Sequence, residues 1–477
     1  MPDIDFNIRA GNTLVGYASI EEVKRSMEED WIKLQSLPVI EEKAQDVDRL
    51  FKLFQQQQTE LGGEVTPEDK QELRNRLKIL EDELNSYLAN EYGIDPKKKV
   101  LYEQWLKSRR PFHWFIEFYG ILKQGGFDVI IGNPPYVEYS KIKTGYTIHK
   151  YHTECCGNIY AYTIERSFKV VSSKGLIGLI VPLSLMSTER MSPLQSLLLQ
   201  ENRTLWLSAY DVYPCKLFEG AKQRLTILLA SSQKKDKSLF TSRYNRWKPD
   251  ERNNLLPNLC FLPSPINRTL SVIPKIGNYL ADSILKKIGN FKTASFLNNA
   301  SQVSFYVHRI PYNYVKAFDF IPYFYNEVDG EKKSEDYKPY YLYDAKHSKI
   351  MLSVLNSGLF FWWWYALFEG YHCGKHEIQS FPIGLCNMMN EVQKKLIEIA
   401  DNLMEDIQSN KNRKSCWYKN TGKVMYDEFY PRKSKAIIDR IDLTLAKHYG
   451  LSEEEVDYIV NYDIKYRSIK DSEEDNL

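Results

Sequence analysis

The sequence predicts an α/β protein built from several domains. Its 477 residues exceed what one hydrophobic core usually holds, which indicates roughly two to four domains. Between residues 127 and 230, short apolar runs alternate with segments of helical periodicity. That alternation is typical of a sheet with helices on both of its faces.

The composition excludes several classes of protein. Hydrophobic residues make up 43% of the chain and charged residues 26%, which is typical of a folded protein. The net charge of +2 excludes a nonspecific polycation but permits a local basic surface. No apolar run approaches the roughly 18 residues of a transmembrane helix, and the start of the chain lacks the pattern of a signal peptide. The seven cysteines show no disulfide or zinc spacing, so we expect a cytoplasmic protein.

The polar stretch over residues 19–108 predicts a pair of long helices. It is rich in Glu, Lys and Gln, and Pro67 directly after Thr66 indicates a helix start. Five leucines recur at helical spacing, namely Leu73, Leu77, Leu80, Leu84 and Leu88. We expect the two helices to form an antiparallel hairpin inserted into the sheet domain.

The remaining elements follow from periodicity. Strands are expected at residues 4–8, 127–132, 175–181, 206–212 and 225–230, and helices at 159–171, 194–199, 389–403 and 433–460. The apolar run over residues 127–132 is typical of a buried parallel strand. We divide the chain into a core strand and turn (1–18), a helical insertion (19–110), an α/β core (111–235), a mixed α+β domain (236–385) and a helical C-terminal region (386–477).

The segment that carries chemistry is Asn133-Pro134-Pro135-Tyr136, directly after the expected strand 127–132. Loops at the carboxyl end of strands are where open α/β sheets place their sites. The prolines hold the backbone rigid, the Asn133 side chain and Pro134 carbonyl are hydrogen-bond acceptors, and Tyr136 offers a stacking plane. This set suits a planar amine whose nitrogen is positioned for nucleophilic attack. The alternative is a plain Asn-Pro turn.

These residues resemble a known family. Residues 127–136 are similar to motif IV of the S-adenosylmethionine-dependent amino-methyltransferases, in particular the adenine-N6 DNA class. Further segments resemble the large type IIG restriction–modification and phage-defence methylases: 111–118, 158–160, 175–182, 217–229 and 355–363. The resemblance implies an incomplete Rossmann-like methyltransferase sheet, with the catalytic core at 111–235 and a target-recognition domain at 236–385. It also implies that the protein methylates adenine N6 in double-stranded DNA.

The resemblance also implies roles for individual residues. Asn133 and Pro134 would accept hydrogen bonds from the adenine amine, and Tyr136 would stack on a base flipped out of the duplex. Phe218 would face the base from the other side; the alternative is a core aromatic. The turn at Asn12, Thr13 and Leu14 would border S-adenosylmethionine; the alternative is a plain strand and turn.

The family's glycine-rich cofactor loop has no counterpart here. None of the candidates Gly62-Gly63, Gly125-Gly126, Gly175 or Gly178 both follows an expected strand and opens a helix. We expect a partner chain to supply this loop and an acidic residue. A truncated product and a catalytically silent DNA-recognition subunit remain alternatives, and an RNA or protein-glutamine methyltransferase is a further one.

Two groups of His and Cys lie close enough together in the sequence to be candidate metal sites. The first comprises His149, His152, Cys155 and Cys156, and the second His372, Cys373 and His376. Neither has a recognised ligand spacing, so we expect no metal site.

Overall fold

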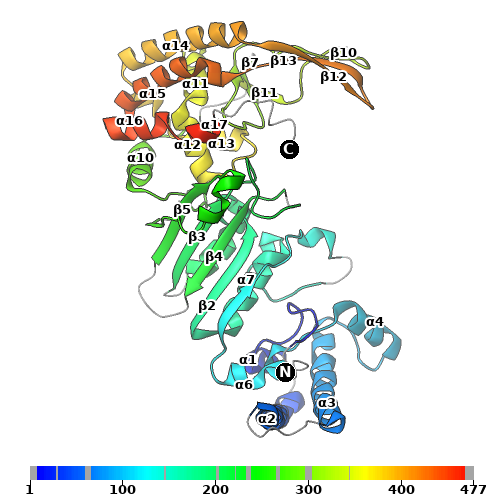
Figure 1. Cartoon of the computed structure of the whole chain (residues 1–477). Helices are drawn as coiled ribbons and strands as arrows, with labels where there is room; N and C mark the ends of the chain where they lie inside the picture. The colour runs from blue at the N-terminus through cyan, green and yellow to red at the C-terminus, as the bar shows by residue number, and fades with distance from the viewer. Residues whose placement is uncertain are drawn as a thin grey trace. The chain divides into compact units, whose positions relative to one another are not determined.

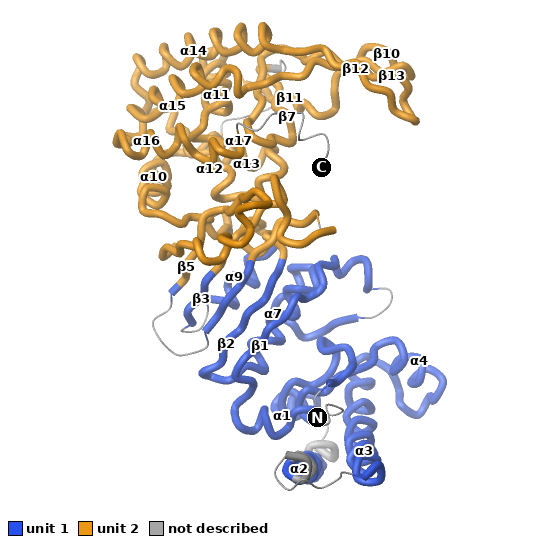
Figure 2. Tube along the Cα trace, in the orientation of Figure 1, with its two compact units in different colours: residues 1–181, 190–206, 227–238 blue, residues 182–189, 207–226, 239–477 orange. Residues whose placement is uncertain are grey.

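The computed structural model describes residues 8–27, 31–59, 66–143, 147–199, 203–220, 222–231, 238–264, 269–295, 303–342 and 344–467. The expected strand at 4–8 lies, apart from Ile8, outside the described residues. The chain divides into two compact units (Figure 2). Unit 1 comprises residues 1–181, 190–206 and 227–238, and unit 2 comprises residues 182–189, 207–226 and 239–477.

The helical insertion contains the expected pair of long helices and two shorter ones. The four are α1 (Ile20–Met27), α2 (Trp31–Thr59), α3 (Pro67–Glu91) and α4 (Lys99–Arg109) (Figure 1). Thr66 caps α3, because its Oγ1 accepts from the Asp69 amide at 3.2 Å while the Asp69 carboxylate accepts from the Thr66 amide. All five spaced leucines of α3 are buried in one apolar cluster, to which α2 contributes Ile40, Ala44 and Val47. The predicted helix start and apolar stripe are therefore confirmed.

A six-stranded mixed sheet follows, with the strand order β1-β2-β4-β3-β5-β6. Its strands are β1 (Phe127–Gly132), β2 (Val171–Pro182), β3 (Thr204–Tyr210), β4 (Leu225–Ser231), β5 (Ser238–Asn245) and β6 (Leu262–Pro263). β1 runs parallel to β2, whereas β6 runs antiparallel to β5. The associated helices are α5 (Trp114–Glu117), α6 (Tyr119–Lys123), α7 (Ile159–Val170), α8 (Ser184–Ser187) and α9 (Ser192–Leu199).

One expectation about β1 was wrong. The strand is parallel as predicted, but it is an edge strand and not a buried one. Val129 is 61% exposed and Ile131 is 85% exposed. Their neighbours on the same sheet face are also exposed: Leu176, which pairs with Val129, and Leu229 on β4. An apolar run favours a strand by itself, whereas burial needs a covering layer, and the described residues leave this face open.

Unit 2 combines helices with two small sheets. The three-stranded sheet has the order β11-β7-β8 and the four-stranded one β10-β9-β13-β12. Their strands are β7 (Val303–His308), β8 (Ala317–Phe318), β9 (Phe324–Asn326), β10 (Gly330–Glu331), β11 (Tyr337–Tyr341), β12 (Asn412–Tyr418) and β13 (Gly422–Glu428). The helices are α10 (Tyr279–Gly289), α11 (Ala345–Asn356), α12 (Gly358–Leu367), α13 (Lys375–Ser380), α14 (Asn390–Ser409), α15 (Lys435–Tyr449), α16 (Glu453–Val460) and α17 (Ile464–Arg467).

The C-terminal helices agree with the sequence, but the hairpin between them was not expected. α14, α15 and α16 cover the stretches predicted to be helical, while β12 and β13 lie between those stretches, in a region for which no strand was predicted. Within the described part of the chain, no single helix is long and apolar enough to cross a membrane. The pair α11 and α12 reaches that length only together, across a bend of 66°, and every side chain of α12 is buried.

Candidate functional site

The loop at residues 133–136 lies where the sequence predicted it, directly after a parallel strand. β1 ends at Gly132, and Asn133 follows with its side chain exposed. Pro134 is buried, Pro135 is exposed and Tyr136 is half-buried. The loop therefore presents the Asn133 side chain at an accessible edge while Pro134 anchors it to the protein.

The Tyr136 hydroxyl lies between two acceptors. It donates to Oδ1 of Asn133 in a short hydrogen bond and also lies 3.2 Å from the carbonyl oxygen of Ile180 on β2. A tyrosine hydroxyl has one proton to donate, so the two acceptors compete for it. Burial raises the pKa of Tyr136, which keeps this proton in place at neutral pH. Because Oδ1 of Asn133 has two lone pairs, it can accept from another group even while the Tyr136 hydroxyl donates to it.

The start of α7 holds the residues that follow Tyr136. The Ile159 amide donates to the Val137 carbonyl at 3.0 Å. The Glu138 carboxylate accepts from Nδ2 of Asn158 at 3.1 Å and pairs with Arg190 at 2.7 Å. Asn158 also caps α7 through its Oδ1. The loop is thus tied to the N-terminus of a helix by both backbone and side-chain bonds.

The turn at Asn12, Thr13 and Leu14 packs beside this loop. Oδ1 of Asn12 accepts from the Leu14 amide at 3.2 Å, which closes the turn, and Thr13 is exposed. Leu14 belongs to an apolar cluster against which Val137 and Tyr139 pack. The structure therefore brings the predicted cofactor turn together with the residues that directly follow Tyr136.

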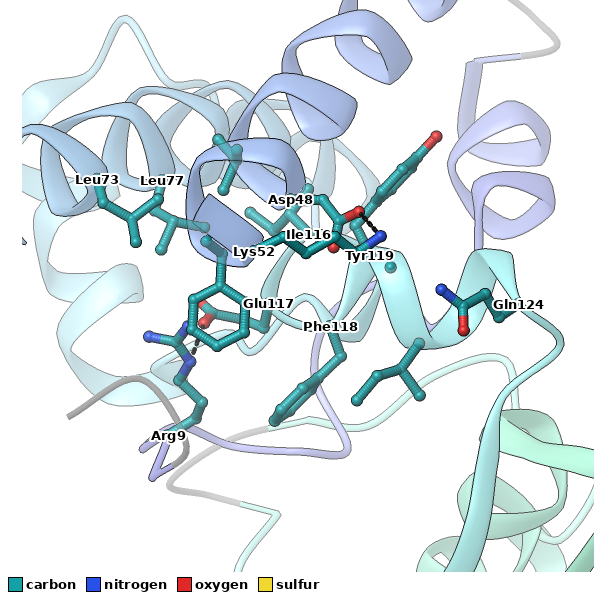
Figure 3. Close-up of a pocket in the computed structure, with 14 residues that line it drawn as sticks. Arg9, Asp48, Lys52, Leu73, Leu77, Ile116, Glu117, Phe118, Tyr119 and Gln124 are labelled. Atoms are coloured by element: carbon teal, nitrogen blue, oxygen red, sulfur yellow. Dashed lines mark ion pairs between the residues drawn. The ribbon is translucent and has the colours of Figure 1, made fainter. Parts of the chain in front are cut away.

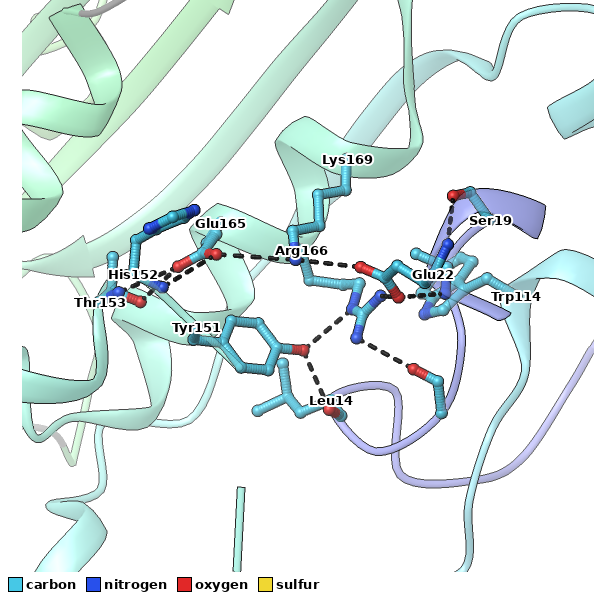
Figure 4. Close-up of polar contacts among 12 residues, drawn as sticks. Leu14, Ser19, Glu22, Trp114, Tyr151, His152, Thr153, Glu165, Arg166 and Lys169 are labelled. Carbon is cyan, nitrogen blue, oxygen red and sulfur yellow. Dashed lines mark hydrogen bonds and ion pairs between the residues drawn. The ribbon is translucent and has the colours of Figure 1, made fainter. Parts of the chain in front are cut away.

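A buried polar network holds the turn in position (Figure 4). The Tyr151 hydroxyl donates to the Leu14 carbonyl at 2.9 Å, and Nε of Arg166 donates to the Tyr151 oxygen at 2.9 Å. Arg166, on α7, also donates to Glu22 and to the Gly16 carbonyl, each at 3.1 Å. Burial opposes the charge of Arg166, but Tyr151 and Glu22 outweigh it and raise its pKa. Arg166 therefore stays charged and links α7 to the turn.

The sequence reasoning missed this network. The available signal was an Arg within the mostly apolar helix expected at 159–171, because a buried charge needs partners. Those partners come from positions more than a hundred residues away, at Glu22 and Gly16. Their identity could not be read from local spacing.

Phe218 lies in the loop between β3 and β4 and is half-buried. An ion pair closes the base of this loop, with Nε of Arg224 3.0 Å from the buried Asp211 carboxylate. Arg252 donates to the carbonyl of Leu217 at 2.8 Å, directly before Phe218. Phe218 belongs to unit 2 and Asn133 to unit 1, so their predicted placement on opposite sides of one base stays a prediction.

A cavity of about 190 Å³ lies in the insertion of unit 1 (Figure 3). α2, α3 and residues 116–124 line it, together with Arg9, which pairs with Glu117 at 3.1 Å. None of the predicted site residues lines this cavity. Among the described residues, no group of three or more His, Cys, Asp or Glu is placed to hold a metal ion.

The three residues predicted to border a cofactor differ in how accessible they are. Oδ1 of Asn12 is engaged within its own turn, and of the three predicted cofactor residues only Thr13 is fully exposed. In the described ranges, the loop after β1 begins Asn133-Pro134-Pro135 and contains no glycine pair.

Part of this chain is similar to a family of known proteins. Residues 28–218 match the family model of the Eco57I restriction-modification methylase. A type II restriction enzyme and methyltransferase of Methanocaldococcus jannaschii is 27% identical over 260 residues, which cover 46% of this chain and 22% of the relative. The chain thus spans about a fifth of that relative's length. The methylase domain confirms the resemblance seen in the sequence.

Solved structures with some backbone similarity are also restriction–modification enzymes. The type IIL enzyme MmeI in complex with DNA has a TM-score of 0.37 at 11% identity, covering 71% of this chain and 57% of MmeI. The type IIG restriction endonuclease BpuSI has a TM-score of 0.27 at 12% identity, covering 70% of this chain and 54% of BpuSI. The backbone similarity is low in both cases.

Proposed function

From the premise that residues 28–218 form a restriction–modification methylase domain, we propose that this chain is part of a site-specific DNA methyltransferase acting on adenine N6. The observation that carries the proposal is the loop at Asn133–Tyr136. It lies within the matched segment, and its exposed Asn133 amide sits at the carboxyl end of a parallel strand. The substrate is double-stranded DNA in a restriction–modification or phage-defence system.

The proposed chemistry follows from the hydrogen-bonding groups of the loop. Oδ1 of Asn133 and the Pro134 carbonyl accept the two N–H groups of the adenine amine, which directs the nitrogen lone pair toward the methyl donor. Tyr136 stacks on one face of the base and Phe218 on the other. The base must be flipped out, because its amine cannot reach a methyl donor inside the duplex. S-adenosylmethionine supplies the methyl group when bound.

The open face of the sheet supports a further polypeptide. Parallel sheets are normally covered on both faces, yet Val129, Ile131 and Leu176 are at least half exposed. The β1 edge has no further strand beside it in the described residues. We propose that a partner chain, or more of the same gene product, covers this face and supplies the glycine-rich loop. The turn at Asn12–Leu14 then borders the cofactor.

Transfer of a labelled methyl group tests the proposal. The chain is co-expressed with the polypeptide encoded directly upstream and incubated with duplex DNA and methyl-labelled S-adenosylmethionine. We expect label in DNA, and digestion to nucleosides should place it in N6-methyladenine. Asn133→Ala should abolish transfer and leave DNA affinity unchanged, while the exposed Asn254→Ala serves as the matched control.

Each other outcome has a distinct meaning. Label in N4-methylcytosine would overturn the adenine assignment alone. Label in protein or RNA and not in DNA would favour the alternative methyltransferase classes. DNA binding without any transfer, even with the upstream polypeptide present, would identify the chain as a recognition subunit without catalysis.

A further inference from the structure

The hairpin of β12 and β13 ends in a tight, defined tip. In the register of the two strands, Trp417 pairs with Lys423 and Tyr418 pairs with Gly422. Three residues connect the strands, and Gly422 has a left-handed φ of +65° that a side chain would strain. The tip is therefore held in shape by its own turn.

This tip extends beyond the rest of its sheet. β12 is an edge strand, and β9 pairs with β13 only from Val424 to Tyr426. Beyond that pairing the Glu327 amide still donates to the Lys423 carbonyl at 3.0 Å, and the rest of the tip is a two-stranded ribbon, which Figure 1 shows projecting from the end of α14. A two-stranded ribbon is narrow enough to enter the major groove of duplex DNA, which is about 12 Å wide.

Two large aromatic side chains lie uncovered on the tip. Trp417 is 72% exposed and Tyr418 is 53% exposed. Aromatic side chains normally bury most of their surface in a core or an interface. By contrast, Trp362, Trp363 and Trp364 of the same unit are each no more than 1% exposed.

The basic side chains at the tip are less paired than those at the base of the hairpin, although the Glu327 carboxylate lies beside Lys423. At the base, the Asp427 carboxylate pairs with Lys411 and Arg413, and Glu428 pairs with Lys414. At the tip, Lys419 and Lys423 are exposed, and no ion pair of theirs is found within the described ranges. The neighbouring Glu327 carboxylate accepts from the Lys423 backbone amide at 2.8 Å.

We infer that the tip of the β12–β13 hairpin, residues 417–423, is a contact surface for duplex DNA. Lys419 and Lys423 bind phosphates, and Trp417 contacts sugars and base edges in the groove. Two free ammonium groups flanking an exposed indole complement a polyanion that also carries flat apolar surfaces. The inference rests on the proposed function but lies outside residues 28–218, so the family match does not assign it.

Binding of the full chain to a fluorescently labelled duplex of random sequence tests this surface. We expect Trp417→Ala to weaken binding roughly tenfold. The double variant Lys419→Ala/Lys423→Ala should weaken it by a similar factor at low salt. The same variant should reduce the slope of log K against log salt by about 2. The control Lys394→Ala/Lys395→Ala removes equal charge from the exposed face of α14 and should change neither quantity by as much.

The two ways of failing are distinguishable. If the wild-type chain binds the duplex and the tip variants bind equally well, this inference is overturned and the proposed function stands. If the wild-type chain binds no duplex, this inference is overturned, whereas the proposed function is decided separately by the transfer assay with the upstream polypeptide. Binding of the tip to phosphatidylserine vesicles without binding to DNA would also overturn the inference. The substituted side chains are exposed, so circular dichroism melts should match the wild type.

Discussion

The hydroxyl of Tyr136 donates to Oδ1 of Asn133 while lying 3.2 Å from the carbonyl of Ile180. One proton therefore serves two acceptors, and the bond to Asn133 fixes the orientation of that side chain while the second lone pair of Oδ1 stays available to accept. This relationship gives Tyr136 two separable properties, a stacking ring and a positioning hydroxyl.

Substitution can separate those two properties. Tyr136→Phe keeps the ring and removes the hydroxyl, so we expect kcat to fall roughly tenfold with KM little changed, as for a lost neutral hydrogen bond. Tyr136→Ala removes both and should raise KM as well. Steady-state methyl transfer by the completed enzyme measures both constants. Equal effects of the two variants would show that the hydroxyl does not position Asn133.

The base of the Phe218 loop should depend on a buried ion pair. Arg224→Ala leaves the Asp211 carboxylate without its 3.0 Å partner, although Arg246 remains at 3.7 Å. We expect a loss of about 3 kcal/mol in the free energy of unfolding. The exposed pair Arg309–Asp336 is the control, and Arg309→Ala should cost under about 1 kcal/mol. Urea denaturation measures the free energy of unfolding of both variants. Similar losses would show that the Arg224–Asp211 pair contributes no more than an exposed pair.

The stability of unit 2 should depend on pH through Asp442. Its carboxylate accepts from the amides of Gly358 and Leu359 at 3.0 and 2.9 Å, at the start of α12. Burial raises the pKa of Asp442 to about 6, above the ordinary value of 3.8. The two amide hydrogen bonds and the nearby Arg467 lower the pKa, but burial outweighs them. The protonated form therefore stabilises the fold. This contribution is complete below about pH 3.8 and is lost as the pH rises through about 6.

Asp442→Asn, which stays neutral, should remove that dependence. Between pH 5 and pH 8 the wild type should lose stability relative to the variant, by an amount on the order of 2 kcal/mol. Denaturant unfolding at the two pH values measures the difference. If the difference in the free energy of unfolding between wild type and variant is the same at pH 5 and pH 8, Asp442 does not titrate in this range.

The two faces of the sheet should respond oppositely to charge. Ile131→Lys places an ammonium on the open face, where Ile131 is 85% exposed, and should change the free energy of unfolding by less than about 0.5 kcal/mol. Ile177→Lys, on the other face and 1% exposed, should cost at least about 3 kcal/mol. Assembly with the upstream polypeptide should be weakened by Ile131→Lys. A large loss of stability from Ile131→Lys in the isolated chain would contradict an open face.

Local sequence determined several features of this protein. The capping box at Thr66, the buried leucines of α3 and the parallel strand ending at Gly132 each depend on side chains within a few residues. The position of Asn133 at the end of β1 follows directly from that strand. The hydrogen bonds of the capping box and the leucine periodicity of α3 are formed within one segment. The apolar run of residues 127–132 favours a strand by its composition, although its ladder bonds go to β2.

The tertiary structure decided what those elements face. Only the fold shows that β1 is an uncovered edge strand, that Arg166 reaches Glu22 and Gly16, and that Tyr136 meets Ile180. It also places β13 between β9 and β12, which makes strands from residues with little periodic signal. These relationships join segments up to about 150 residues apart, so neither propensity nor spacing specifies them. Burial and partnership depend on what packs against a segment, and that is decided only when the whole chain has folded.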